Sequence, residues 1–176
     1  MTHFLSVRAL VTAVIVCLLS AVSEVAGQSQ QIGKSRFNPA YGVVLPQSAG
    51  EPLRRPRLCN RPMPWPIEGS WTPDAEVISR LEARLAPALQ TALADAPSGR
   101  YAKPQVSEFY RQYLGFIVAG RRIVYVNAAR EQIVRGGRPE EWKTVAWNGC
   151  DGGLSLFGAE YDPATDTVHN LNFNGR

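Results

Sequence analysis

Histidine is the scarcest of the residues that could do chemistry in this sequence. Only His3 and His169 occur among the 176 residues, and His3 lies in an apolar leader. A Ser-His-Asp or Cys-His relay would therefore need His169, inside a predicted strand, as its base. Ser155 matches a nucleophile elbow on one side only, because Phe157 stands where the G-x-S-x-G spacing requires glycine. The sequence favours a non-catalytic protein.

Cysteine use favours a disulfide over a reactive thiol or a metal site. Cys17 lies in the leader, which leaves Cys59 and Cys150 as an even count in an exported chain. A disulfide between them would close a long loop, worth roughly 4–5 kcal/mol in the chain-entropy model. The alternative is a pair of unpaired thiols, one of them catalytic. One histidine and two oxidised cysteines cannot supply a zinc site, so no metal and no cofactor are expected.

Acidic residues near the C-terminus suggest a second metal hypothesis. Glu160, Asp162 and Asp166 could offer oxygens to calcium, yet they lack the ligand spacing of an EF-hand loop. The preferred interpretation is a hairpin turn whose geometry is set by Asp162 and Pro163. Carboxylates that are neighbours only in sequence, such as Glu140 and Glu141, do not establish a glycosidase pair.

The first 27 residues are typical of a secretory signal peptide. Arg8 is followed by an uncharged run over residues 9–22, which as a helix would span about 21 Å. That length is short of the roughly 30 Å hydrocarbon core, and small residues precede the expected cleavage after Gly27. An uncleaved anchor is the alternative. Cleavage would give a secreted or periplasmic protein without a membrane span.

The next segment, residues 28–69, is predicted to be an extended arm rich in proline and arginine. Seven of the thirteen prolines lie in it, and proline cannot donate to a helix or a central strand. Its basic residues form a candidate site for an anion or a protein partner, although a solvated leader is the alternative. No aromatic residues are interleaved with this basic run, which argues against nucleic acid, as does the expected compartment. The candidate residues are Arg54, Arg55, Arg57 and Arg61.

A single domain is expected over residues 70–176. Thr72-Pro73-Asp74 is a helix start in which Thr72 can cap, and apolar residues at helical spacing then continue to Leu93. Pro87 predicts a kink or a second short helix after Ala86. The later sequence changes to aromatic and β-branched runs separated by turn residues. These runs predict strands at residues 109–118, 122–128, 142–148, 154–161 and 167–173.

This order of elements predicts an α+β fold in which one helix packs on a curved antiparallel sheet of about four or five strands. The arrangement resembles a cystatin-like or NTF2-like roll, a likeness of architecture over residues 70–176. The Gln-x-Val-x-Gly motif of cystatins is missing, so protease inhibition is not implied. Alternation places Phe109, Arg111 and Tyr113 on one face of the first strand and Gln112, Leu114 and Phe116 on the other. Which face the helix covers is left open, although the second set has the composition of a core.

Three functional hypotheses follow. The preferred one is an exported, non-catalytic binding module that engages a protein or an anionic component of a bacterial-type envelope. The alternative is a small enzyme or small-molecule carrier that uses a cavity between helix and sheet. Its candidate pocket residues are Tyr113, Tyr125, Trp147 and His169. A third hypothesis is a homodimer formed through the last strand.

Overall fold

The computed structural model describes residues 41–54, 57–58, 61–94, 103–136 and 141–175. All of them belong to the second of two compact units, Ser35–Arg176. The predicted signal peptide therefore lies outside the described residues. The elements in chain order are β1 (Gly42–Val44), η1 (Gln47–Leu53), β2 (Arg57–Leu58), β3 (Arg61–Pro62), β4 (Gly69–Trp71), α2 (Ala75–Ala94), η2 (Val106–Glu108), β5 (Phe109–Val118), β6 (Arg121–Arg130), α3 (Glu131–Gly136), η3 (Glu141–Lys143), η4 (Gly153–Ser155), β7 (Leu156–Asp162) and β8 (Thr167–Phe173).

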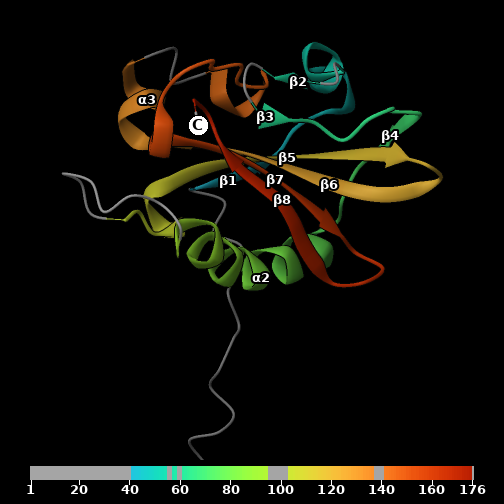
Figure 1. Ribbon diagram of the computed structural model, residues 1–176. Helices are drawn as coiled ribbons and strands as arrows, with labels where there is room; N and C mark the ends of the chain where they lie inside the picture. The colour runs from blue at the N-terminus through green and yellow to red at the C-terminus, as the bar shows by residue number, and fades with distance from the viewer. Residues whose placement is uncertain (1–40, 55–56, 59–60, 95–102, 137–140, 176) are drawn as a thin grey trace, which may run out of the picture. The chain divides into compact units, whose positions relative to one another are not determined.

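The fold combines few helices with a curved, open sheet (Figure 1). The strands follow the order β1-β5-β6-β7-β8, and β4 also pairs with β5. One edge of β5 is shared, because β1 pairs with residues 111–113 and β4 with residues 115–117. The β1–β5 pair is parallel, which corrects the prediction of a purely antiparallel sheet. This pairing also brings part of the predicted arm into the sheet.

Helix α2 begins after Asp74, whose carboxylate oxygen Oδ1 accepts a hydrogen bond from the Val77 amide at 2.8 Å. Asp74 is therefore the capping residue, in place of the predicted Thr72, because its side chain reaches the third residue of the helix. The helix continues as one element through Pro87 to Ala94, so no separate second helix follows Ala86. Its buried apolar residues have the spacing that the sequence predicts.

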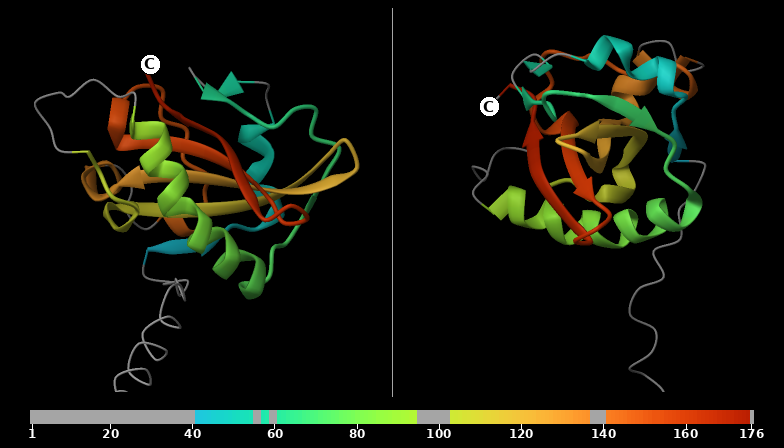
Figure 2. Two further views of the ribbon diagram at one scale, coloured as in Figure 1. Left: turned by 60° about the horizontal axis from the view of Figure 1, so that its bottom comes forward. Right: turned by 90° about the vertical axis from the view of Figure 1, so that its right-hand side faces the viewer.

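One face of the sheet packs against α2. Fully buried leucines of the helix contact Phe109 and Tyr113 of β5, together with inward residues of β6 and β7. The sheet thus turns the Phe109–Arg111–Tyr113 set toward the helix. Figure 2 shows α2 crossing this face.

The opposite face of the sheet is also covered. Leu114 and Phe116 of β5 pack with Leu45, Leu53 and Met63, which come from the segment before the helix. The figures place η1 on the side of the sheet away from α2 (Figure 2). Leu114 and Phe116, which had the composition of a core in the sequence, are therefore buried. They are covered by the segment before the helix and not by the helix itself.

The predicted strand over residues 142–148 is wrong. This stretch forms η3 and a loop, and β6 pairs directly with β7. The backbone of the loop is satisfied by side chains, because the Gln112 amide donates to the carbonyls of Trp142 and Val145 at 2.6 and 2.7 Å. The Asn127 amide likewise donates to the Trp147 carbonyl at 2.9 Å. Aromatic residues made this segment strand-like in sequence, but these amide contacts replace a neighbouring strand.

Candidate functional site

The four residues of the predicted pocket lie in different places. Tyr113 is buried under α2, whereas Tyr125 is buried on the opposite face of the sheet. Trp147 is half-buried in the loop beside Asn127. His169 lies on β8, where its Nε2 is 3.5 Å from Glu160 Oε2. The structure therefore does not bring these four residues together in one pocket.

A buried ion pair occupies the interface between α2 and the sheet. Arg111 Nε lies 2.8 Å from Glu82 Oε1, and the two side chains are 4% and 5% exposed. The Tyr113 hydroxyl donates to the same carboxylate, and Arg111 also donates to the carbonyls of Val106 and Phe109. Burial, reinforced by the Glu82 charge, raises the pKa of Tyr113 well above its usual value. The cluster fills the interface where a helix–sheet cavity was proposed.

The candidate basic residues of the arm do not form one exposed surface in the described part of the chain. Arg54 is partly exposed and pairs with Glu51 at 3.1 Å. Arg61 is only 1% exposed, and its Nη2 donates to Asn127 Oδ1 at 2.5 Å. Arg55 and the side chain of Arg57 lie outside the described residues. Arg61 is thus unavailable to a partner that docks on the surface.

Of the two cysteines of the predicted disulfide, Cys150 is described and Cys59 lies outside the described residues. Cys150 lies in an exposed bend after the loop that ends at Trp147. Arg61, two residues beyond Cys59 in the sequence, and Trp147 both hydrogen-bond to Asn127. The sequence neighbours of the two cysteines therefore meet on the same side chain, and the pairing stays a prediction.

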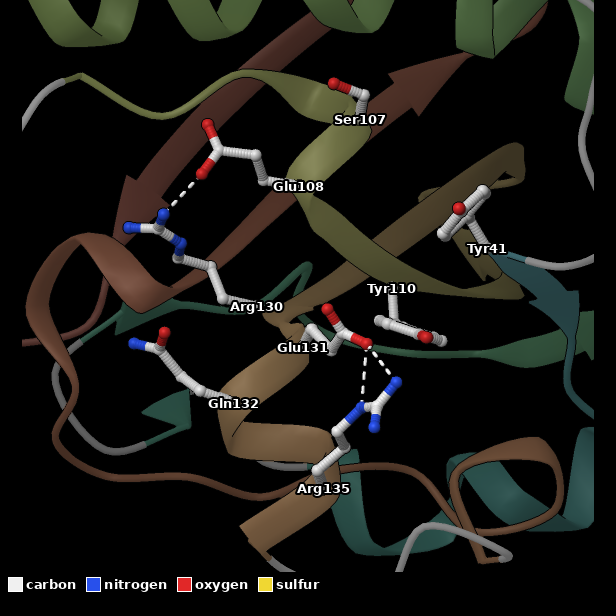
Figure 3. A pocket seen from close by; sticks show the side chains of 8 residues that line it. All are labelled: Tyr41, Ser107, Glu108, Tyr110, Arg130, Glu131, Gln132 and Arg135. Atoms are coloured by element: carbon white, nitrogen blue, oxygen red, sulfur yellow. Dashed lines mark hydrogen bonds and ion pairs between the residues drawn. The ribbon is translucent and has the colours of Figure 1, made fainter.

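A groove of about 640 Å³ opens where β1, η2, β5, the end of β6 and α3 meet (Figure 3). We call it the Tyr41 groove. Its lining combines aromatic rings with charged and amide side chains, and none of the described residues that line it is a histidine or a cysteine. The lining residues are Tyr41, Ser107, Glu108, Tyr110, Arg130, Glu131, Gln132 and Arg135.

One wall of the Tyr41 groove is aromatic. The rings of Tyr41 and Tyr110 meet edge-to-face with centroids 5.7 Å apart, and Tyr110 meets Trp142 in the same way at 5.1 Å. Tyr41 is 41% exposed, which makes it one of the large exposed apolar residues among those described. Lys143 Nζ lies 5.9 Å from the centre of the Trp142 ring. Stacked rings of this kind form a rigid contact surface with hydroxyl groups at its margin.

The other walls carry two ion pairs, drawn as dashed lines in Figure 3. Arg130, at the end of β6, pairs with Glu108 of η2. Within α3, Arg135 Nη2 lies 2.6 Å from Glu131 Oε1. The Arg135 and Glu131 side chains are 75% and 52% exposed. An exposed pair of this kind contributes about 0–1 kcal/mol, so Arg135 can exchange its glutamate for a ligand group at small cost.

Sequence reasoning missed this groove. The sequence places Tyr110 and Trp142 only within the predicted strands at residues 109–118 and 142–148, and Glu131 and Arg135 have the i,i+4 spacing of a helical ion pair. Tyr41 reaches them because the amide of Arg111 donates to the Tyr41 carbonyl at 2.7 Å as β1 joins β5. No local sequence pattern predicts that β1, a strand of three residues, pairs in parallel with residues 111–113 of β5.

The described residues hold no group of three or more His, Cys, Asp or Glu side chains that could bind a metal ion. In the same part of the chain, no helix is both long and apolar enough to span a bilayer. Comparisons with protein-family models, curated proteins and solved structures give no match.

Proposed function

We propose that this protein is an exported, non-catalytic binding module that engages a protein partner through the Tyr41 groove. The observation that carries the proposal is the groove itself, where the exposed ring of Tyr41 and the exposed, weakly paired Arg135 line one hollow. Aromatic and arginine side chains are the residue types that dominate the energy of protein interfaces. A partner segment could stack on Tyr41 and pair with Arg135 without unfolding any element.

The charges of the groove favour a protein partner over a polyanion. Its two arginines and two glutamates cancel in formal charge. A strongly acidic polymer would meet Glu108 and Glu131 as well as the arginines, whereas a peptide can present groups of both signs. The groove also lies beside β1, which is the terminal strand of the sheet order. A neighbouring strand edge suits an extended peptide, which could add hydrogen bonds along it.

The alternative function, a small enzyme or small-molecule carrier, would use space between α2 and the sheet. In the described residues that interface is filled by leucines, aromatic rings and the Glu82–Arg111 pair. His169, the base that a relay would need, lies on β8 with its Nε2 3.5 Å from Glu160 of β7, and it does not line the groove. These observations support the binding module better than the alternative.

The same proposal includes features that the sequence supports. They are the signal peptide over residues 1–27, the disulfide between Cys59 and Cys150, and a secreted or periplasmic location. At the level of the fold, we include the cystatin-like or NTF2-like roll, which the helix-covered curved sheet supports.

A homodimer through the last strand is a weaker part of the proposal. Strand β8 does end the sheet order, as a pairing edge must. However, the β7–β8 register shifts between Gly158 and Glu160, and Asn170 has a left-handed backbone with φ of 50°. Irregular edges of this kind work against pairing with a second copy.

The test is a comparison of two double variants of the mature chain, residues 28–176, in pull-downs from native envelope extract. The groove variant is Tyr41→Ala with Arg135→Ala, both at exposed positions. The matched control is Trp65→Ala with Arg80→Ala, an exposed aromatic residue and an exposed arginine outside the groove.

We expect a discrete protein to be captured by wild type and control but lost from the groove variant. With the purified partner, the groove variant should bind about 10- to 100-fold more weakly, as expected for loss of interface anchors. Deletion of residues 28–40, which ends before β1, separates the arm from the groove. Capture that survives in the groove variant but disappears with this deletion would move the partner site to the arm and refute the groove.

A further inference from the structure

The lining of the Tyr41 groove also indicates which kind of partner segment it accepts. This inference rests on the proposed partner-binding function and concerns the same groove. In Figure 3, Tyr110 lies between Tyr41 and the Glu131–Arg135 pair. A segment that lies along this side of the groove therefore meets aromatic rings first and then a guanidinium group.

The two tyrosine rings form an apolar corner. Their planes are inclined at 65°, and their centroids are 5.7 Å apart. Tyr41 is exposed and Tyr110 is half-buried, whereas Trp142, which packs against Tyr110, is only 5% exposed. Because Trp142 supports the Tyr110 ring, a rigid apolar ring of a ligand can pack in the corner with little loss of side-chain freedom.

The polar groups of this side are mainly hydrogen-bond donors. In the part of the chain that the structure describes, the hydroxyls of Tyr41 and Tyr110 have no hydrogen-bond partner, nor has Arg135 Nη1. Arg135 binds Glu131 through Nε and Nη2 only, at 2.7 and 2.6 Å. Arg135 can therefore donate from Nη1 to a ligand and keep its glutamate.

The carboxylates of the groove are already engaged by the protein. Glu108 accepts through both oxygens, from the Gln105 amide at 2.7 Å and from Arg130. Glu131 accepts both bonds from Arg135 at Oε1. A charged ligand would have to compete with one of these pairs, whereas an uncharged ligand that supplies acceptors leaves both pairs in place.

We propose that the partner presents an uncharged, proline-rich segment in the polyproline II conformation, which lies along Tyr41, Tyr110 and Arg135. Its proline rings pack in the tyrosine corner, and its carbonyls accept hydrogen bonds from the two hydroxyls and from Arg135. Polyproline II has no internal hydrogen bonds, so its carbonyls are available, and proline brings no N–H that would need an acceptor. Its backbone is already extended before binding, which lowers the entropy cost of docking on aromatic side chains.

The test is binding of a fluorescein-labelled nonaproline amide to the full chain, followed by fluorescence anisotropy. The control ligand is a labelled peptide of the same length made of glycine, serine and alanine, which is uncharged but flexible and rich in N–H groups. We expect saturable binding of nonaproline, and binding of the control ligand that is weaker by about tenfold or more. The protein control Trp65→Ala with Arg80→Ala lies outside the groove and should keep the wild-type affinity.

Tyr41→Phe and Tyr110→Phe separate the hydroxyls from the rings. Each variant keeps the ring and removes one donor, so each should weaken nonaproline binding about two- to tenfold, as expected for one neutral hydrogen bond. Tyr41→Ala also removes the exposed ring and should weaken binding further. Unchanged affinity in both phenylalanine variants would overturn the proposal, with circular dichroism used to check that each variant is folded.

Competition in the pull-down separates this inference from the proposed function. Excess unlabelled nonaproline should displace the captured partner from the wild type. Capture that depends on Tyr41 and Arg135 but resists nonaproline would leave the partner-binding groove intact and overturn the proline-rich segment. Equal affinity for nonaproline and the control ligand would overturn it too. Capture that is insensitive to Tyr41 and Arg135 would refute the proposed function and this inference with it.

Discussion

Replacing Arg111 by methionine tests the packing of α2 on the sheet. The change leaves Glu82 as a buried carboxylate without its cation, at a place where both side chains are at most 5% exposed. Solvent screening is therefore small, and loss of one partner of such a pair costs about 3–5 kcal/mol. The Tyr113 hydroxyl and two backbone carbonyls also depend on this cluster. We expect the free energy of unfolding, measured with urea, to fall by that amount.

The double variant Glu82→Met with Arg111→Met separates charge from packing. Because it removes both charges, we expect it to be destabilised by less than the sum of the single variants, with a coupling energy of about 1–3 kcal/mol. Arg135→Met, which breaks an exposed pair, is the control and should cost less than about 1 kcal/mol. A cost for Arg111→Met as small as that of the control would refute the buried pair as the link between helix and sheet.

Three other outcomes follow from the fold. Gly115→Ala places a Cβ 2.2 Å from the Trp71 carbonyl oxygen and should lower the free energy of unfolding by about 1–3 kcal/mol or more in urea; an unchanged value would contradict the β4–β5 contact. The pKa of Tyr125, about 12 in the folded protein, lies above its usual value of 10. The stability that comes from keeping Tyr125 protonated is therefore complete below pH 10 and is lost as the pH rises toward 12. In Tyr125→Phe, the free energy of unfolding should fall less steeply over this pH range. Thiol titration of residues 28–176, unfolded and unreduced, should find no free group at Cys59 or Cys150, and two free thiols would return a cysteine nucleophile to consideration.

The parts of the fold that the sequence predicts are those with local causes. Asp74 and the apolar periodicity specify α2 within one segment. The β5–β6 hairpin is equally local, because Ala119 and Gly120 both adopt the positive φ angles of its tight turn. Strand alternation also predicts correctly that Phe109 and Tyr113 share one face of β5 and that Leu114 and Phe116 share the other.

The remaining features depend on contacts between distant segments. Residues 142–148 have strand-like composition, yet the side-chain amides of Gln112 and Asn127 hold them as a loop. Proline content predicted an extended arm outside the domain of residues 70–176, but Leu53 and Met63 of that arm are buried against the second face of the sheet. Such burial depends on the shape of the surface that these residues meet, and a linear pattern does not encode that shape.

The candidate site has the same origin. Tyr41 and Tyr110 meet only because β1 pairs in parallel with β5, and Arg135 joins them only because α3 follows β6. Arg61 looked like a surface charge in sequence, and its burial beside Tyr125 follows from the cover over the second face. Residue type therefore predicted the chemistry of these side chains but not which of them act together.

Site-specific photocrosslinking at Tyr41 tests the central claim most directly. A photoreactive phenylalanine analogue would replace Tyr41 in the full chain, and the same analogue at exposed Trp65 would serve as the control. We predict a discrete crosslinked protein adduct at position 41 that is absent at position 65. Irradiation that gives no adduct at position 41, or the same adduct at both positions, would contradict a partner-binding groove.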